Sequence, residues 1–214
     1  MQSQDTDFAL KNFIVLEGID GSGTSTQMRF IEAAFKEKGL AHMVTAEPTG
    51  RPEGQLIRKI LQGELDADPG TVAHLFASDR HQHLYGKAGI VEALESGKLV
   101  VCDRYVLSSL AYQGSTCGRD LPEYLNARFP APGLTIFFKI DPEHSLQRLS
   151  SRSKLEIYEK MHMQKLVDIA YETTIAQKRS RGWKIETVNA EKPIDQVRQE
   201  VFTIIEAYTG FTIA

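Results

Sequence analysis

The chain has 214 residues, of which 42% are hydrophobic and 25% are charged, and its formal net charge is −3 at pH 7. These values are typical of a soluble globular protein with a sizeable core, so we expect residues 1–214 to form one domain. The slight negative charge argues against nucleic acid or an anionic membrane as the main partner. No apolar run approaches the length of about 20 residues that a membrane-spanning helix needs.

The start of the chain and its cysteines indicate in which cellular compartment the protein is expected. Residues 1–11 lack the basic and then apolar pattern of an export signal. The chain has two cysteines, Cys102 and Cys117, and two such thiols suit a reducing environment better than a disulfide framework. We therefore expect a cytoplasmic protein.

The first predicted elements are an apolar strand over 13–16 and a helix that begins at Ser25 and ends near Lys38, before Gly39. The loop between them is rich in glycine and reads Gly18, Ile19, Asp20, Gly21, Ser22, Gly23, Thr24, Ser25 and Thr26. Strand, glycine-rich turn and helix in this order form a phosphate-binding loop, because the glycines let successive N–H groups point at a phosphate. The positive end of the helix adds to the attraction, and the Ser25 hydroxyl stands where such loops bind Mg²⁺.

Thr24 breaks the usual pattern of this loop, which has a lysine before the Ser/Thr position. A threonine keeps a hydroxyl but brings no positive charge. A glycine-rich turn without a ligand is the alternative interpretation, and the strand before it and the helix after it argue against that alternative.

The remaining predicted elements alternate between strands and helices. Further strands are predicted over 41–45, 98–102, 134–140 and 183–188, and helices over 53–61, 68–96 (with a possible bend at Gly86 and Gly89), 107–112, from 142 onward, 154–178 and 194–208. This alternation predicts an α/β protein, a parallel sheet with helices on both faces. Ligands of such folds bind beyond the carboxyl ends of the strands.

Asp103 and Arg104 follow directly after one of these strands. An aspartate in this position is the expected partner of a phosphate loop, because with Ser25 it can hold the Mg²⁺ that bridges two phosphates. The planar guanidinium of Arg104 suits a phosphate. A salt bridge at the strand end is the alternative for Asp103, and the phosphate loop upstream makes the metal site the better interpretation.

Three segments make the chain resemble bacterial thymidylate kinases (dTMP kinases), and the resemblance covers nearly its whole length. They are Phe-Ile-Val-Leu-Glu-Gly-Ile-Asp-Gly-Ser-Gly at 13–23, Leu-Phe-Ala-Ser-Asp-Arg at 75–80 and Asp-Arg-Tyr-Val-Leu-Ser-Ser-Leu-Ala-Tyr-Gln-Gly at 103–114. The resemblance implies a three-layer αβα P-loop NTPase fold with a five-stranded parallel sheet. It also implies phosphoryl transfer from ATP to dTMP with Mg²⁺, and a homodimer.

The same resemblance assigns roles to side chains. In the acceptor site, Phe76 stacks on thymine, Arg80 donates to a base carbonyl, and Arg104 holds the acceptor phosphate. In the rest of that site, Asp20 orients the acceptor and Ser109 contacts the base edge. Tyr112 packs under the sugar and disfavours a 2′-hydroxyl, and Gln113 completes the wall. Asn189 and Ala190 belong to the loop that flanks adenine. Without the resemblance, an aromatic residue in a helix such as Phe76 is more often part of the core.

Several positions depart from the family pattern. Ala46 stands where the family often has an arginine before Glu-Pro; Arg51 either reaches in instead or is a solvated loop charge. Residues 148–160 resemble the lid over ATP, in which Arg148 and Arg152 lie four apart and either face the phosphates as catalytic cations or are solvated. In that segment Ile157 replaces an expected arginine. Arg148, Arg152 and Lys154 are the candidates for supplying the charge that Thr24 lacks.

Three functional hypotheses follow. The first is an active kinase that phosphorylates dTMP with ATP and Mg²⁺, with a lid cation replacing the loop lysine. The second is a nucleotide-binding protein with little or no catalysis that acts as a sensor or partner subunit, which Thr24 and Ile157 motivate. The third is a kinase for another (deoxy)nucleoside monophosphate.

Overall fold

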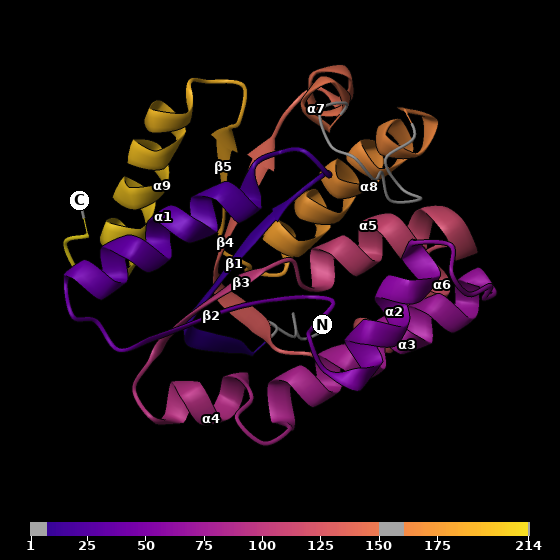
Figure 1. The fold of residues 1–214 in the computed structure, drawn as a ribbon, viewed down its shortest axis with the longest axis horizontal. Coiled ribbons are helices and arrows are strands. Elements are labelled where there is room, and N and C mark those ends of the chain that lie inside the picture. The colour runs from indigo at the N-terminus through magenta and orange to yellow at the C-terminus, as the bar shows by residue number, and fades with distance from the viewer. Residues whose placement is uncertain (1–7, 150–160, 214) are drawn as a thin grey trace, which may run out of the picture.

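The structure, a computed structural model, describes residues 8–149 and 161–213. Within these ranges the strands are β1 (Ala9–Gly18), β2 (His42–Ala46), β3 (Leu99–Asp103), β4 (Ala131–Lys139) and β5 (Ile185–Asn189). The helices are α1 (Thr24–Glu37), α2 (Pro52–Leu61), α3 (Pro69–Tyr85), α4 (Ile90–Glu95), α5 (Val106–Cys117), α6 (Asp120–Asn126), α7 (Pro142–Leu149), α8 (Met161–Ser180) and α9 (Ile194–Thr209). Strands and helices alternate along most of the chain, as the sequence predicts (Figure 1).

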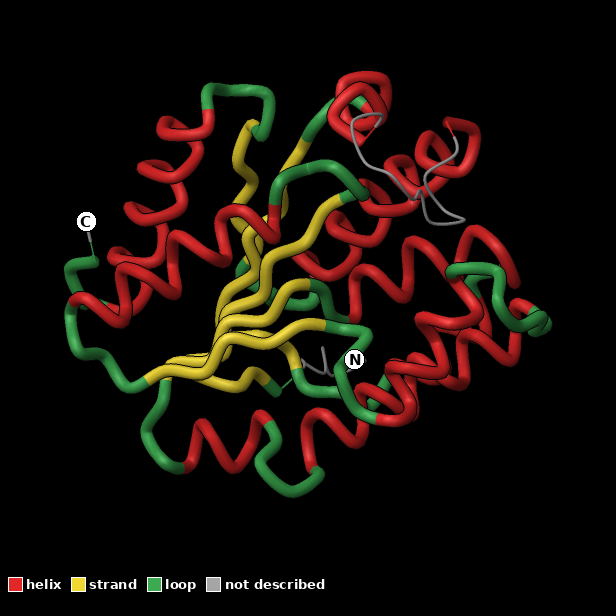
Figure 2. The backbone as a smooth tube through the Cα atoms, viewed as in Figure 1, coloured by secondary structure: helices red, strands yellow, loops and turns green. Residues whose placement is uncertain are grey.

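The strands form one parallel sheet in the order β2-β3-β1-β4-β5. Figure 2 shows this sheet in the middle of the molecule, with helices on both sides. Helices α1 and α9 pack on one side, while α4, α5 and α8 lie on the other (Figure 1). The five-stranded parallel sheet with helices on both faces is therefore confirmed.

The central strands are apolar because both of their faces are covered. Phe13, Ile14 and Leu16 of β1 are fully buried, as are Val100 and Val101 of β3. A strand that is buried on both faces needs a continuous apolar run rather than an alternating pattern. This is why the sequence marks these strands so clearly.

The register of the sheet brings the ends of the strands to one edge. Leu16 of β1 pairs with Asp103 of β3, and Ala46 of β2 pairs with the same residue. On the other side, Gly18 pairs with Phe138 of β4. The loop after β1 and the residues after β3 therefore start side by side, where ligands of open α/β sheets bind.

The structure corrects the expectation of one bent helix over 68–96. Helix α3 ends at Tyr85 and α4 begins at Ile90, with Gly86 and Gly89 in the connection. Gly86 is extended (φ −72°, ψ 166°), and a Cβ at Gly89 would lie only 2.6 Å from the carbonyl oxygen of Gly86. The chain turns here too tightly for a continuous helix.

Further elements differ from the expectation: α5 ends at Cys117 rather than at 112, and β4 begins at Ala131 rather than at 134. The sequence does not predict the seven-residue helix α6. Strand β1 begins four residues earlier than expected, and its pairing register with β4 shifts between Leu10 and Ile14, where Asn12 has φ 65°. Of the predicted helix over 154–178, residues 161–178 belong to α8, and the first part lies outside the described residues. Among the described helices, none has the length and apolar character needed to cross a bilayer.

Candidate active site

The loop between β1 and α1 has the backbone that a phosphate site needs. Gly21 and Gly23 have positive φ angles of 82° and 96°, a conformation that side chains with a Cβ rarely adopt. Gly23 is the N-cap of α1, so the helix begins at Thr24, one residue earlier than expected. The N-terminus of a helix of 14 residues carries positive partial charge and favours an anion at this point.

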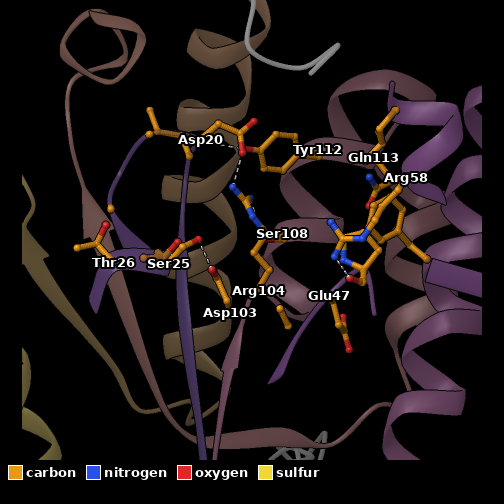
Figure 3. A pocket seen from close by; sticks show the side chains of 18 residues that line it. Asp20, Ser25, Thr26, Glu47, Arg58, Asp103, Arg104, Ser108, Tyr112 and Gln113 are labelled. Atoms are coloured by element: carbon orange, nitrogen blue, oxygen red, sulfur yellow. Dashed lines mark hydrogen bonds and ion pairs between the residues drawn. The ribbon is translucent and has the colours of Figure 1, made fainter. Parts of the chain in front are cut away.

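A cavity of about 410 Å³ opens between this loop and helices α2, α3 and α5 (Figure 3). Its walls are formed by Ile19, Asp20, Gly21, Gly23, Thr24, Ser25, Thr26, Ala46, Glu47, Pro48, Arg58, Leu61, Phe76, Asp103, Arg104, Ser108, Tyr112 and Gln113. The volume is typical of a small-molecule site. Fold and register thus bring residues from Ile19 to Gln113, far apart in the sequence, around one space.

Ser25 and Asp103 lie in contact at the floor of this cavity. The Ser25 hydroxyl donates a hydrogen bond of 2.8 Å to Oδ2 of Asp103 (Figure 3). The second carboxylate oxygen, Oδ1, is buried and has no hydrogen-bond partner among the described residues. A hydroxyl beside a carboxylate oxygen is a suitable ligand pair for Mg²⁺, which takes one or two protein carboxylates and completes its shell with water and substrate phosphates.

Arg104 and Asp20 form an ion pair above this floor, between the two ends of the cavity (Figure 3). The backbone N–H of Asp20 donates to the Tyr112 hydroxyl over 3.1 Å, and the Arg104 guanidinium carbon lies 5.1 Å from the centre of the Tyr112 ring. Burial opposes the charge on Arg104, but the nearby Tyr112 and Asp20 leave its pKa well above the ordinary value. Arg104 is therefore a permanent cation in the cavity wall.

Phe76 and Gln113 line the cavity, whereas Arg80 and Ser109 lie one layer behind it. Arg80 is only 1% exposed, and its guanidinium donates to the Ser109 hydroxyl over 3.0 Å. The same guanidinium donates two bonds, of 2.9 and 2.7 Å, to one carboxylate oxygen of Glu47. A buried arginine needs an acceptor, and Glu47 supplies it.

Arg51 points away from the cavity. Its guanidinium donates to the backbone carbonyls of Lys87 and Ala88, the former over 2.8 Å. Another arginine, Arg58 of α2, lines the cavity instead and donates to the Pro48 carbonyl (Figure 3). Arg58 lies in the last turn of α2 and belongs to none of the motifs that the sequence marks, so the sequence alone does not single it out.

A second cavity, of about 340 Å³, lies on the other side of the phosphate loop. It is lined by Gly21, Ser22, Gly23, Thr26, Gln27, Arg148, Ala190, Lys192, Ile194 and Val197. The Arg148 guanidinium donates to the Ala190 carbonyl over 2.8 Å, so α7 and the loop after β5 meet here. Asn189 does not line this cavity; its side-chain oxygen accepts from the N–H of Glu191.

Thr24 lines the first cavity and is only 6% exposed. Among the described residues, the basic side chains that line either cavity are Arg58, Arg104, Arg148 and Lys192. Arg152, Lys154 and Ile157, which the sequence analysis places in the lid, lie outside the described residues.

Comparison with known proteins gives a consistent result. A family model described as thymidylate kinase matches residues 16–201. A putative thymidylate kinase of Treponema pallidum is 38% identical over 93% of this chain and 97% of its own length. A thymidylate kinase of Bacillus pumilus is 35% identical over 91% and 94% of the two chains, and a probable thymidylate kinase of Pyrococcus abyssi is 34% identical over 91% and 95%.

Proposed function

The chain belongs to the thymidylate kinase family, and we propose that it transfers the γ-phosphoryl group of ATP to dTMP, which yields ADP and dTDP. The observation that carries this proposal is that the phosphate loop and the residues suited to the acceptor nucleotide line one cavity. Phosphoryl transfer needs little covalent help from a protein, because catalysis is mostly positioning and neutralisation of charge on the transferred oxygens.

On the donor side, the triphosphate of ATP lies on the N–H groups of the loop from Gly18 to Thr26, at the positive end of α1. The adenosine part occupies the second cavity, beside Arg148 and Ala190. The volume of that cavity and its apolar residue Val197 support this assignment. Asn189 remains a proposed contact at the edge of the adenine.

Ser25 and Asp103 are the proposed ligands of Mg²⁺. The unpaired Oδ1 of Asp103 and the adjacent Ser25 hydroxyl fit the ion, which when bound neutralises charge on the phosphates of ATP. The protein's own contribution is to hold the Ser25 hydroxyl, on α1, 2.8 Å from Oδ2 of the same carboxylate, on β3.

On the acceptor side, Arg104 binds the phosphate of dTMP, and Asp20 beside it orients that group towards the donor. Phe76 stacks on thymine, and Tyr112 packs under the deoxyribose and disfavours a 2′-hydroxyl. The buried Oε1 of Gln113 has no partner among the described residues, which makes it an acceptor suited to the N3–H group of thymine. These five residues all line the same cavity.

Arg80 and Ser109 complete the dTMP site from behind. Both are buried and bonded to each other, so we assign them the support of the wall that carries Phe76 and Gln113. Arg51 is the weakest member of the proposed dTMP set, because its guanidinium is held by the loop after α3.

The charge that Thr24 lacks comes, in this proposal, from the lid. Arg148 lines a cavity with the phosphate loop, which supports it as one such cation. Arg152 and Lys154, which lie outside the described residues, are the other candidates from the sequence. Loss of one phosphate-contacting cation lowers the rate on the order of 10³- to 10⁵-fold, so a substitute is needed for useful turnover.

We further propose that residues 1–214 act as one domain, that two copies form a homodimer, and that the protein works in the cytoplasm. The family match over residues 16–201 supports a single unit. Cys102 and Cys117 are free thiols, which supports a reducing compartment.

A coupled assay of ADP release with dTMP, ATP and Mg²⁺ tests the function. We expect turnover that depends on all three. Absence of turnover above background would contradict the proposal; calorimetry that then shows tight binding of dTMP and ATP would establish the nucleotide-binding protein without catalysis.

A further inference from the structure

Glu17, the residue before the phosphate loop, carries a buried carboxylate with four hydrogen-bond donors around it. Oε1 accepts from the backbone N–H groups of Tyr105 and Ser108, over 2.9 and 3.2 Å. Oε2 accepts from the Ser108 and Tyr171 hydroxyls, over 2.6 and 2.9 Å. The side chain is fully buried and does not line the cavity of the acceptor, so it acts on the reaction only through other residues.

This carboxylate caps helix α5 from another element. The N-cap residue of α5, Tyr105, makes no capping bond with its own side chain. The first N–H groups of a helix need acceptors outside the helix, and a negative charge at that end is favourable. Glu17 of β1 supplies both, and so fixes the start of α5 against the strand that leads into the phosphate loop.

Arg104, directly before this cap, has an unusual backbone conformation. Its φ angle is 73°, in the left-handed region that a residue with a side chain rarely adopts. The N–H of Arg104 donates to the Leu16 carbonyl over 2.8 Å, and the Cys102 thiol donates to the Arg104 carbonyl over 3.1 Å. The Glu17 bond to the N–H of Tyr105 holds the peptide that follows, so the strained residue is fixed on both sides.

We propose that Glu17 is a positioning residue: its carboxylate holds Arg104 in the conformation that receives the phosphate of the acceptor nucleotide. This inference rests on the proposed function, because it takes Arg104 as the ligand of the dTMP phosphate. The Tyr171 hydroxyl belongs to α8, and it lies 2.7 Å from the Ser108 hydroxyl as well as in contact with Glu17. Tyr171 therefore orients the same carboxylate.

The substitution Glu17→Gln tests the inference, since the amide keeps the size of the side chain but replaces one accepting oxygen with a donor. Glu186→Gln is the matched control, a strand glutamate that is exposed on β5. Binding of dTMP and of thymidine is measured by calorimetry. Thymidine lacks the phosphate, so the ratio of its Kd to that of dTMP reports the contacts with the phosphate, for which Arg104 is the proposed cation.

In the wild-type protein we expect dTMP to bind more tightly than thymidine. In Glu17→Gln the ratio falls roughly tenfold while the Kd of thymidine stays unchanged, and in Glu186→Gln neither changes. A carboxylate that only stabilises the fold would weaken both ligands together, and that result, or an unchanged ratio, would overturn the inference. A wild-type protein that binds neither ligand would instead refute the proposed function.

If Glu17→Gln does not fold, Tyr171→Phe decides the question. It removes one donor to the carboxylate and leaves the bonds to Tyr105 and Ser108 in place. We expect the ratio to fall in the same direction by roughly threefold. An unchanged ratio in a folded Tyr171→Phe protein would refute the positioning role.

Discussion

Gly21 of the phosphate loop packs directly against Ser145 of α7. A Cβ added at Gly21 would lie 2.6 Å from the Ser145 carbonyl oxygen and 3.1 Å from the Leu149 side chain. The loop and the helix that carries Arg148 are therefore in backbone contact, with no room for any side chain between them. A side chain at the position of Gly21 therefore does not fit without a shift of α7.

This contact predicts that Gly21→Ala destabilises the protein more than Gly23→Ala. Both glycines have positive φ, but a Cβ at Gly23 meets no atom within 4 Å. We expect a loss in the free energy of unfolding of roughly 1–2 kcal/mol for Gly23→Ala from the backbone alone. The clash adds about 1–3 kcal/mol for Gly21→Ala. Urea denaturation of the two variants measures the difference, and equal losses would show that α7 moves away freely.

The Ser25–Asp103 pair predicts a metal dependence. Asp103→Asn removes the charge of the unpaired carboxylate oxygen, so we expect the Mg²⁺ concentration for half-maximal rate to rise roughly 10- to 100-fold. The rate is measured at saturating ATP and dTMP while Mg²⁺ is varied, and EDTA abolishes it in every variant. Asp66→Asn, an exposed loop position, is the control. An unchanged Mg²⁺ requirement in Asp103→Asn would show that the ion binds elsewhere.

Thr24→Lys restores the cation that phosphate loops usually carry. Under the proposal a lid cation supplies part of this charge, so we expect kcat to rise by about 10- to 100-fold rather than by the full factor of an added catalytic cation. Thr24→Met has a long side chain without charge and separates the effect of charge from that of volume. The prediction fails if the lysine variant folds, binds ATP and turns over no faster than wild type.

The two cysteines differ in reactivity. Cys102 is fully buried in β3, and burial raises the pKa of its thiol well above the ordinary value; Cys117 at the end of α5 is partly exposed and its pKa is raised less. Since the thiolate is the reactive form, iodoacetamide at mildly alkaline pH modifies Cys117 at least roughly tenfold faster. Peptide mass spectrometry measures the two rates. Equal rates in the folded protein would contradict the buried position of β3.

The sequence predicts the strands and the phosphate loop well, because apolar runs that are buried on both faces and glycines with positive φ are local signals. The division of residues 68–96 into α3 and α4 is harder to predict from the sequence. Helix α3 has polar and apolar residues on all sides, and it stops only where Gly86 turns extended. Its partners lie on α2, α5 and α6, which sequence spacing does not reveal.

Tertiary contacts also decide which arginine lines the cavity. Arg51 and Arg58 are both basic residues near the Glu-Pro pair, yet Arg51 binds carbonyls after α3 and Arg58 lines the cavity. Likewise, Phe76 and Arg80 lie four residues apart on α3, yet Phe76 lines the cavity while the Arg80 guanidinium binds Glu47 in the layer behind. Such outcomes depend on acceptors that are distant in the sequence.

The acceptor cavity predicts an order of substrates. At equal concentration we expect dTMP to react faster than dUMP by roughly tenfold or more, because a pocket gains about that much from one buried methyl group. We expect the ribonucleotide of thymine to react more slowly still, since in the proposal Tyr112 packs under the sugar and disfavours a 2′-hydroxyl. We expect dGMP to react slowest, because a purine is larger than the thymine that is assigned to the site. One ADP-release assay with the four nucleotides measures kcat/KM for each. ATP without an acceptor gives the background. Equal values for dTMP and its ribonucleotide would refute the role of Tyr112, and preference for dGMP would identify a kinase for another monophosphate.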